Sequence, residues 1–319
     1  MNIEQARIVA TNEVQSGILK IESITFGGDS TTFRIVSETG NYILRSGGKR
    51  SNYDVEHAVL KLLIKKGVKV PVPVSDHIDI SNPDLSFSLQ REIRGVDLFR
   101  SKLPVTFWPT VVEELGRNLK SVHSLAFSGF GPISTDVFRS TKKLIGSFDT
   151  YSEFINNYFS FRVKGFKERL IADEKNGFKD SNLNKEQIRK VIEIVDRIPE
   201  GQSRIDEGFV DYLSEGRLLH GDFHSQHILV NRKKFVGIID FNNVSIGDPL
   251  FDIAYWSIMP KDGFTKELLD NSGIKMDEDK FRLYRLIISI GKLHTRYVTH
   301  NYLNEYPEII DFALEELNR

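Results

Sequence analysis

The stretch HGDFHSQHILV, residues 220–230, decides the fold of this 319-residue chain. It is followed by GIIDF at 237–241 and by GDPLFD at 247–252. The runs at 228–230 and 236–239 are short, apolar and rich in β-branched residues, so we predict two strands that pair as a hairpin.

Three polar side chains would then meet at one end of this hairpin. Asp222 lies on the loop before the first strand, His227 opens that strand, and Asp240 ends the second. A carboxylate and an imidazole can hold a divalent metal there beside a second, free carboxylate. Phosphoryl transfer from a nucleotide uses that set of groups, metal ligands for the phosphates and a carboxylate for the attacking hydroxyl.

The order and spacing of the three segments resemble the aminoglycoside phosphotransferase family, whose pattern is H-G-D-x-x-x-x-N, then I-D, then G-D-P-x-x-D. That family shares its fold with eukaryotic-type protein kinases. The resemblance covers roughly residues 20–255. It implies an α+β, two-lobed fold: a small antiparallel β lobe that binds nucleotide at residues 1–95, and a larger, mainly helical lobe for catalysis and substrate binding at 96–319.

The resemblance also implies roles for single residues. Asp222 would be the catalytic base and Asp240 a Mg²⁺ ligand, while Asp248 and Asp252 would brace the loop and helix behind the site. The family usually has Asn as the second metal ligand, and this chain has His227 there, as the 2''-aminoglycoside and macrolide phosphotransferases do. Imidazole ligates divalent metals, although Mg²⁺ prefers oxygen. A nucleotide-binding pseudokinase is the alternative that His227 motivates.

The first hundred residues are rich in strand-forming residues. Residues 27–32 join two predicted strands, and backbone N–H groups and hydroxyls in such a turn can bond phosphate oxygens. By the resemblance, Arg45 on the third strand contacts the α and β phosphates and pairs with Glu56 on the next helix. Backbone groups near Glu92 and Ile93, in the hinge between the two lobes, would hold the nucleotide base. The predicted nucleotide-binding residues are Ser30, Thr31, Arg45, Glu56, Glu92 and Ile93.

Helical periodicity dominates the rest of the chain. A helix is predicted within the small lobe, and the connection to the large lobe falls near residues 91–97. Only residues 218–240 are expected to return to strand character in the second lobe. The predicted helices lie at 54–66, from 109 to about 126, at 151–172, at 184–198, and over most of 251–319.

Composition excludes several classes of site and partner. The chain has 43 Lys and Arg against 44 Asp and Glu, which makes a nucleic-acid surface unexpected. It has no cysteine, so disulfides, thiolate metal sites and a cysteine nucleophile are excluded. The N-terminus does not resemble a signal peptide, and no apolar run is long enough to span a membrane. We therefore expect a cytoplasmic monomer without a membrane or nucleic-acid partner.

The histidines of the loop leave a second hypothesis. His220, His224 and His227 could form a zinc site, but their spacing is not a familiar zinc pattern and the later GDPLFD segment would have no role. We expect His220 to bond backbone in the loop, and the sequence assigns no role to His224. His123, on a helix that resembles the family's L-H-x-L helix, is expected to pack in the core. Trp108 and Trp256 are expected in the core or at the interface between the lobes.

The family phosphorylates hydroxyls of aminoglycosides, macrolides, choline, homoserine and sugars. Residues 200–222 and 251–319 carry more acidic than basic residues, and a polycationic aminoglycoside needs carboxylates around its ammonium groups. The prediction is therefore an ATP- or GTP-dependent, Mg²⁺-dependent kinase of an aminoglycoside-like antibiotic. The alternative is a kinase of another small hydroxyl substrate: a macrolide, choline, homoserine or a sugar. Ordinary solvated helix faces explain these acidic residues equally well. The acidic candidates are Asp206, Glu207, Asp211, Asp262, Glu305 and Glu308.

Overall fold

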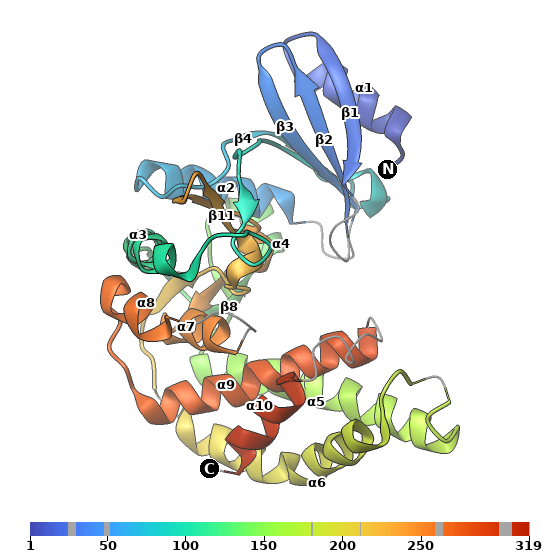
Figure 1. The fold of residues 1–319 in the computed structure, drawn as a ribbon, viewed down its shortest axis with the longest axis vertical. Helices are drawn as coiled ribbons and strands as arrows, with labels where there is room; N and C mark the ends of the chain where they lie inside the picture. Colours follow the sequence, from blue (N-terminus) through green and yellow to red (C-terminus); the bar gives the residue numbers. More distant parts are fainter. Residues whose placement is uncertain are drawn as a thin grey trace.

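The computed structural model places a β-sheet lobe at one end and a helical lobe at the other, with the chain termini at opposite ends (Figure 1). It describes residues 1–24, 30–47, 52–179, 181–210, 212–258, 264–299 and 308–318. The predicted α+β, two-lobed fold is confirmed.

The sheet of the small lobe is antiparallel, with the strand order β1-β2-β3-β5-β4. Successive side chains of a strand point to opposite faces of the sheet. On β3, Tyr42 and Leu44 are buried on one face, whereas Arg45 on the other face is only partly buried. The predicted antiparallel sheet of the small lobe is confirmed, with the two strands on either side of residues 27–32 followed by the strand that carries Arg45. The strands are β1 (Ile18–Ile24), β2 (Thr31–Ser37), β3 (Gly40–Ser46), β4 (Pro73–His77) and β5 (Phe87–Arg91).

Two helices accompany this sheet, not the one that was predicted. Helix α1 (Ile3–Glu13) begins with a capping box between Asn2 and Gln5 and packs Ala6 and Ala10 against the sheet. Helix α2 (Tyr53–Lys65) buries Val55, Val59, Leu60 and Leu63 instead in the core of the large lobe.

The large lobe is mainly helical, as predicted. Its longest helices, α5 and α6, lie at the end of the molecule away from the sheet, beside α9 and α10 (Figure 1). Trp108 and Trp256 are buried, which confirms their predicted place in the core. The helices are α3 (Trp108–His123), α4 (Thr135–Thr141), α5 (Tyr151–Lys175), α6 (Lys185–Gly208), α7 (Leu250–Ser257), α8 (Thr265–Ser272), α9 (Glu278–Leu293), a π-helix (His294–Thr299) and α10 (Glu308–Leu317).

Short strands are more widespread in this lobe than predicted. Five of them form a second sheet in the order β7-β10-β13-β8-β9, so the expectation of strand only at 218–240 is wrong. Each has four residues or fewer, too short for an alternating pattern to show in the sequence. They are β7 (Ala126–Phe127), β8 (Phe130–Ile133), β9 (Gly146–Phe148), β10 (Gly216–Leu219) and β13 (Ser245–Gly247).

The hairpin predicted from the opening motif is confirmed. Strand β11 (Ile228–Asn231) pairs antiparallel with β12 (Lys234–Ile238), and β6 (Val96–Asp97) pairs with the other edge of β11. The turn consists of Arg232 and Lys233, with φ values of 47° and 67°. A turn with positive φ at both positions favours Asn and Gly, so the backbone of Arg232 and Lys233 is strained here.

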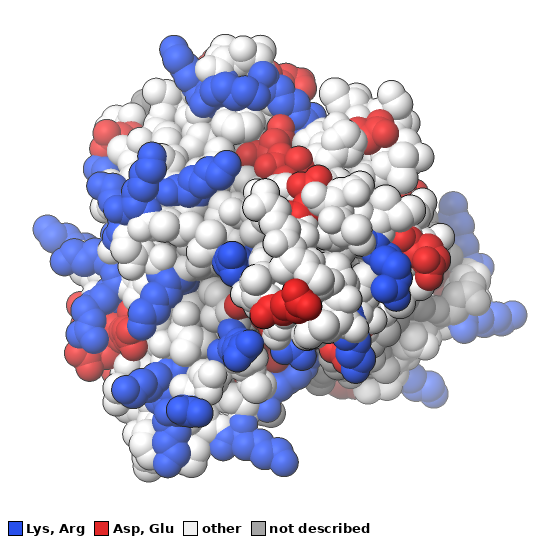
Figure 2. All heavy atoms as spheres, turned by 90° about the horizontal axis from the view of Figure 1, so that it is seen from above, with Lys and Arg blue, Asp and Glu red and all other residues white. Residues whose placement is uncertain are grey.

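The surface of the small-lobe end carries scattered charge. Seen from that end, Lys and Arg side chains spread over much of the face, and Asp and Glu lie among them in smaller groups (Figure 2). Within the described residues, no helix is both long and apolar enough to cross a membrane.

Candidate active site

Asp222 lies on the loop between β10 and β11, with its side chain 21% exposed. Lys292 of α9 places Nζ 3.2 Å from Asp222 Oδ1, and His224 places Nε2 3.5 Å from the same oxygen. Burial alone would raise the pKa of Asp222, but the Lys292 ammonium and the His224 contact hold that pKa well below its usual range. Asp222 is therefore ionised at neutral pH.

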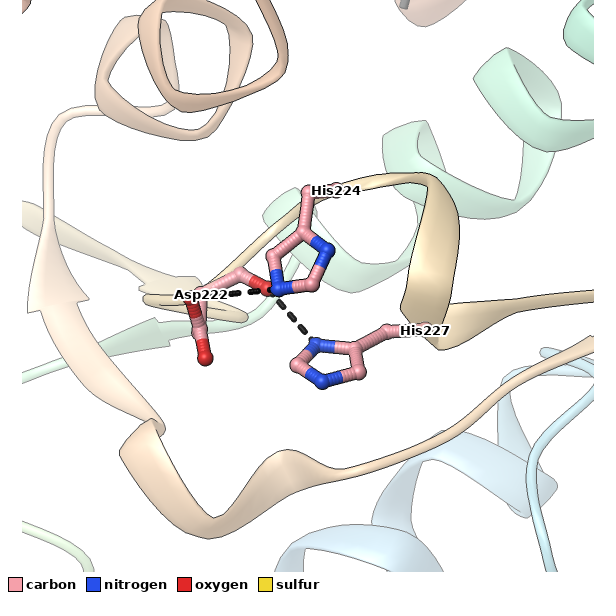
Figure 3. Close-up of side chains that lie close together, drawn as sticks. All are labelled: Asp222, His224 and His227. Atoms are coloured by element: carbon pink, nitrogen blue, oxygen red, sulfur yellow. Dashed lines mark hydrogen bonds and ion pairs between the residues drawn. The ribbon is translucent and has the colours of Figure 1, made fainter. Parts of the chain in front are cut away.

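His224, which had no predicted role, is a neutral partner of that carboxylate. Its Nδ1 accepts the N–H of Gln226, so Nε2 carries the proton that faces Asp222. Burial, together with the nearby His227, lowers the pKa of His224 to about 3. Asp222, His224 and His227 gather within one turn of the loop (Figure 3).

The tautomer of His227 follows from its bond to the backbone. Its Nδ1 lies 2.9 Å from the carbonyl oxygen of Asp222, which can only accept, so Nδ1 donates. In the neutral ring, Nε2 then presents a lone pair toward Asp240 Oδ2, 3.5 Å away. Two acceptors at that distance are suited to a cation between them.

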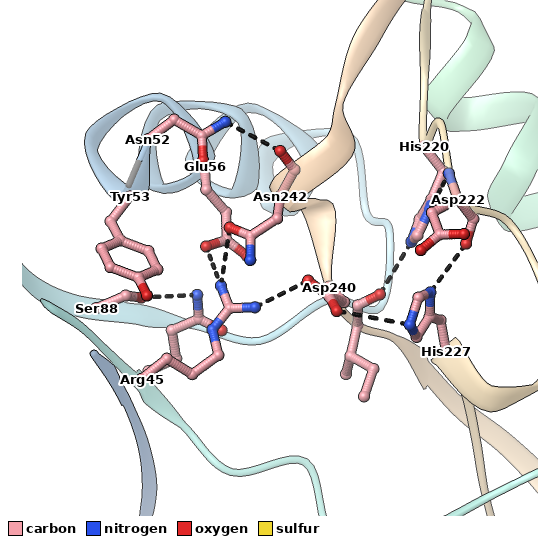
Figure 4. A network of polar contacts seen from close by, with 12 residues as sticks. Arg45, Asn52, Tyr53, Glu56, Ser88, His220, Asp222, His227, Asp240 and Asn242 are labelled. Atoms are coloured by element: carbon pink, nitrogen blue, oxygen red, sulfur yellow. Dashed lines mark hydrogen bonds and ion pairs between the residues drawn. The ribbon is translucent and has the colours of Figure 1, made fainter. Parts of the chain in front are cut away.

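Asp240 connects the two lobes. Its backbone is left-handed, with φ 67° and ψ 62°, and its carboxylate faces Arg45 of the small lobe. Arg45 Nη1 of β3 lies 2.9 Å from Asp240 Oδ1, and Arg45 Nη2 pairs with Glu56. The predicted Arg45–Glu56 ion pair is confirmed, and the contacts continue from Arg45 through Asp240 to His227 and Asp222 (Figure 4).

Arg45, Glu56 and Asp240 shift one another's pKa values. Burial would lower the pKa of Arg45, but the carboxylates of Glu56 and Asp240 raise it above its usual value. Burial would raise the pKa of Asp240, and Arg45 lowers it. Burial raises the pKa of Glu56, which is 1% exposed, and Arg45 opposes that rise.

The catalytic loop is held from behind by buried polar groups. Asp252 of α7 accepts the N–H groups of His220 and Gly221 at 2.9 and 3.0 Å, and the His123 ring lies 3.0 Å from it. His220 donates Nε2–H to the carbonyl of Ile239, and its Nδ1 accepts the Asp222 N–H. The backbone role predicted for His220 is confirmed, and a zinc site that includes His220 does not fit. His123 bonds Asp252 as well as packing in the core.

Gly221 is required where it stands. Its φ is 78°, and a Cβ there would collide with the carbonyl oxygen of Asn243. Asp248 has the predicted bracing role, because it accepts the hydroxyls of Tyr212 and Tyr284 at 2.9 and 2.8 Å and the N–H of Leu250.

The family model of the phosphotransferase enzyme family matches residues 20–272. The chain belongs to this family. It is accordingly an enzyme that transfers a phosphoryl group to a hydroxyl, and its two-lobed, kinase-like fold is that of the aminoglycoside phosphotransferases.

Solved structures of this family share the fold over the whole chain. Aminoglycoside phosphotransferase APH(4)-Ia, as a thermostable mutant in its apo form, is 16% identical, with a TM-score of 0.69 over 98% of each chain. ADP-bound APH(2'')-Ib is 17% identical, with a TM-score of 0.58 over 100% of this chain and 99% of that one. A gentamicin complex of APH(2'')-IIa is 18% identical, with a TM-score of 0.59 over 100% and 96%. A search of curated proteins finds no match.

The predicted nucleotide-binding residues lie on the strands of the small lobe, on α2 and directly after β5. Thr31 opens β2, and Ser30 directly precedes that strand. Residues 27–29 of the predicted phosphate loop lie outside the described part of the chain. Glu92 bonds Arg34 and Asn41 through its carboxylate, and its N–H donates to the Asn41 carbonyl, so these groups are directed into the sheet. The nucleotide role of these residues stays a prediction.

A cavity of about 640 Å³ lies beside this hinge, away from Asp222. Ile93 nearby packs against Gly237 of β12, which ties the hinge to the hairpin. The cavity wall has six basic residues and one acidic residue, and it includes the hairpin turn. It is lined by residues 94–96, 100–104 and 230–233 with Arg34 and Glu92.

Sequence reasoning missed Lys292, Tyr255 and Asn242. Lys292 lies over the Tyr255 ring, 4.4 Å from its centroid, and Asn242 Oδ1 is 3.4 Å from Arg45 Nη2. One signal for Lys292 existed: it is a lone cation in the buried apolar run of α9 from Leu286 to Leu293. A cation in such a buried run is rare unless an anion pairs with it, so Lys292 indicated a buried partner.

Proposed function

We propose that this enzyme transfers the γ-phosphoryl group of ATP or GTP to a hydroxyl of a small molecule with the help of Mg²⁺. The observation that carries the proposal is the arrangement of two carboxylates, Asp222 and Asp240, on either side of His227, with Arg45 joined to the second. One carboxylate is free for the acceptor and the other is placed for the phosphates. Nucleotide binding is also supported by solved relatives whose complexes contain ADP or AMP-PNP.

Asp222 orients the attacking hydroxyl and accepts its proton as the oxygen–phosphorus bond forms. Because Lys292 and His224 keep Asp222 ionised, the carboxylate is a ready acceptor but a weak base. Orientation of the hydroxyl in line with the γ-phosphate is therefore its main contribution.

The residues present fit Mg²⁺. His227 Nε2 lies 3.5 Å from Asp240 Oδ2, and Asp240 is ionised. Bound there, the metal would neutralise charge on the nucleotide phosphates. Arg45 holds the other oxygen of Asp240, and we assign it the α and β phosphates.

An aminoglycoside acceptor stays a prediction. Solved relatives bind hygromycin B and gentamicin. Of the six acidic candidates in this chain, Asp211, Asp262 and Glu305 lie outside the described residues. Asp206 and Glu207 form bonds within α6, to Gln202 and Ser203. A cytoplasmic monomer without a nucleic-acid partner likewise stays a prediction.

The test is nucleotide turnover with Mg²⁺ and an acceptor panel, in the wild type and in Asp222→Asn. We expect the variant to lose about 10³-fold or more of acceptor-dependent turnover while binding nucleotide normally. Unchanged turnover in Asp222→Asn would refute the mechanism. Nucleotide binding without turnover of any acceptor would favour the pseudokinase that His227 suggested.

A further inference from the structure

We propose that the acceptor of this enzyme is an anion, a hydroxyl compound with a carboxylate or phosphate that binds a basic cluster between α5 and α9. This inference names the substrate class of the proposed function and rests on it. The basic cluster consists of Arg162 on α5, Lys292 at the end of α9, and Arg296 in the π-helix that continues it. His294 lies in the same π-helix, and burial lowers its pKa, so it adds a polar ring rather than a charge.

Lys292 joins the cluster to the reacting group. Lys292 is 8% exposed. Its Nζ lies between Asp222 Oδ1, 3.2 Å away, and the centroid of the Tyr255 ring, 4.4 Å away. A buried ammonium is costly unless an anion faces it. Asp222 supplies one such anion, and it must also receive the acceptor hydroxyl.

Arg162 lies against Gly291, the residue before Lys292, and its charge acts on Lys292. A Cβ on Gly291 would stand 3.1 Å from Arg162 Cδ and 3.2 Å from its Nε, so the glycine lets α5 and α9 approach closely here. The guanidinium covers the ring of Tyr158, 3.4 Å from its centroid, and Nη1 donates to the Tyr158 carbonyl. These contacts hold the charge of Arg162 in place without neutralising it.

Few carboxylates pair with Arg162 and Lys292 among the described residues. Among the ion pairs that join described residues, only that of Lys292 with Asp222 brings a carboxylate to Arg162, Lys292 or His294. Asp173, further along α5, is occupied by Arg169 at 2.9 Å and by the Tyr297 hydroxyl. Burial lowers the pKa of Lys292, and the charges of Arg296 and Arg162 lower it further against the pull of Asp222. An acceptor anion would relieve this repulsion, and a polycation would increase it.

The cluster is on the side from which an acceptor must come. The predicted nucleotide and metal groups lie between Asp222 and the small lobe, whereas α5 and α9 lie on the other side of the loop (Figure 1). An in-line transfer requires the hydroxyl to approach opposite the leaving nucleotide. Phe161, 58% exposed and 5.8 Å from the His294 ring, adds an apolar surface for the body of the acceptor.

The experiment compares three acceptors of one size and different charge: glucose, gluconate and glucosamine, with kanamycin as a polycation. Phosphoryl transfer from ATP with Mg²⁺ is measured for the full chain, and binding of gluconate and glucosamine to the ADP-loaded protein is measured in parallel. We expect gluconate to be preferred over glucosamine by about tenfold or more in kcat/KM or in affinity, which corresponds to about 1.4 kcal/mol. Arg162→Gln should remove most of this preference. The matched control is Lys164→Gln, two residues along α5 and 76% exposed, which should keep it.

Two outcomes would overturn the inference while leaving the proposed function intact. One is a preference for glucosamine or kanamycin that depends on Asp222. The other is an equal loss for all acceptors in Arg162→Gln, with normal thermal unfolding, which would assign the cluster to the transferred phosphoryl group. A protein that binds no nucleotide and shows no transfer that depends on Asp222 would instead refute the proposed function.

Discussion

The two sides of the catalytic loop hold opposite excesses of charge. On the nucleotide side, one cation, Arg45, faces two carboxylates, Glu56 and Asp240. On the acceptor side, one carboxylate, Asp222, faces the basic cluster through Lys292. The first side therefore has more negative than positive charge and the second has more positive than negative charge. The comparison indicates which ligand completes each: a metal cation on the first side and an acceptor anion on the second.

The largest effect is expected when the nucleotide side loses a carboxylate. Asp240→Asn keeps a residue that tolerates the left-handed backbone, so the fold should remain. We expect turnover to fall about 10³-fold or more, and the dependence of nucleotide affinity on Mg²⁺ to disappear. Titration of nucleotide binding with Mg²⁺ measures this. Asp270→Asn, on the exposed face of α8, is the control, and a wild-type Mg²⁺ response in Asp240→Asn would contradict the assignment.

Removing the cation of the nucleotide side should have a smaller effect that does not depend on the acceptor. Arg45→Met leaves Glu56 and Asp240 without their counter-charge. We expect kcat/KM for the nucleotide to fall about 100-fold, or about 2.7 kcal/mol, by the same factor with gluconate and with glucosamine. Arg91→Met, exposed in the same sheet, should change little. A factor that varied with acceptor charge would show that the two sides are not independent.

Acidification should lower the free energy of unfolding through His224, which lies on the catalytic loop between the two sides. His224 is buried and neutral with a pKa of about 3, whereas an unfolded histidine titrates near 6.5. Between these values the unfolded chain binds the extra proton, so the free energy of unfolding falls as pH falls. At pH 5 the loss is about 2 kcal/mol. Urea unfolding at pH 7 and pH 5 measures it. His224→Asn should lose less on acidification, the exposed His77→Asn should match the wild type, and equal losses in all three would exclude His224 as the source.

The smallest expected effect is a change in stability from the β11–β12 turn, which belongs to neither side of the catalytic loop. In the β11–β12 turn, Arg232→Asn with Lys233→Gly supplies residues suited to positive φ. We expect a gain of about 1 kcal/mol in the free energy of unfolding, measured by urea denaturation. The reverse order, Arg232→Gly with Lys233→Asn, is the matched control for loss of the two charges. Lower stability in both variants would indicate that the contact of Lys233 with Phe107 outweighs the strain.

The sequence predicted the nucleotide side far better than the acceptor side, for a physical reason. Asp222, His227 and Asp240 lie within one hairpin, so their meeting follows from local pairing. Arg45 and Glu56 lie on consecutive elements. Lys292 is separated from Asp222 by 70 residues, and only the packing of α9 on the large lobe brings them together.

Two further misses have local causes. Helix α1 buries only Ala6 and Ala10, so its sequence lacks the apolar stripe that predicts a packed helix. The short strands of the second sheet are ordered by neighbours distant in the chain, as where β10 pairs with both β7 and β13.

The segment after β12 has a consequence for lobe motion. By its chain it belongs to the large lobe, but Arg45 bonds Asp240 and Asn242 from β3, and Asn52 bonds the Asn242 carbonyl from the start of α2. A rotation of the small lobe about residues 91–97 must therefore carry this segment with it or break these bonds. The moving body would then include residues far beyond the predicted boundary at residue 95, and opening of the cleft would displace the Asp240 carboxylate along with the sheet.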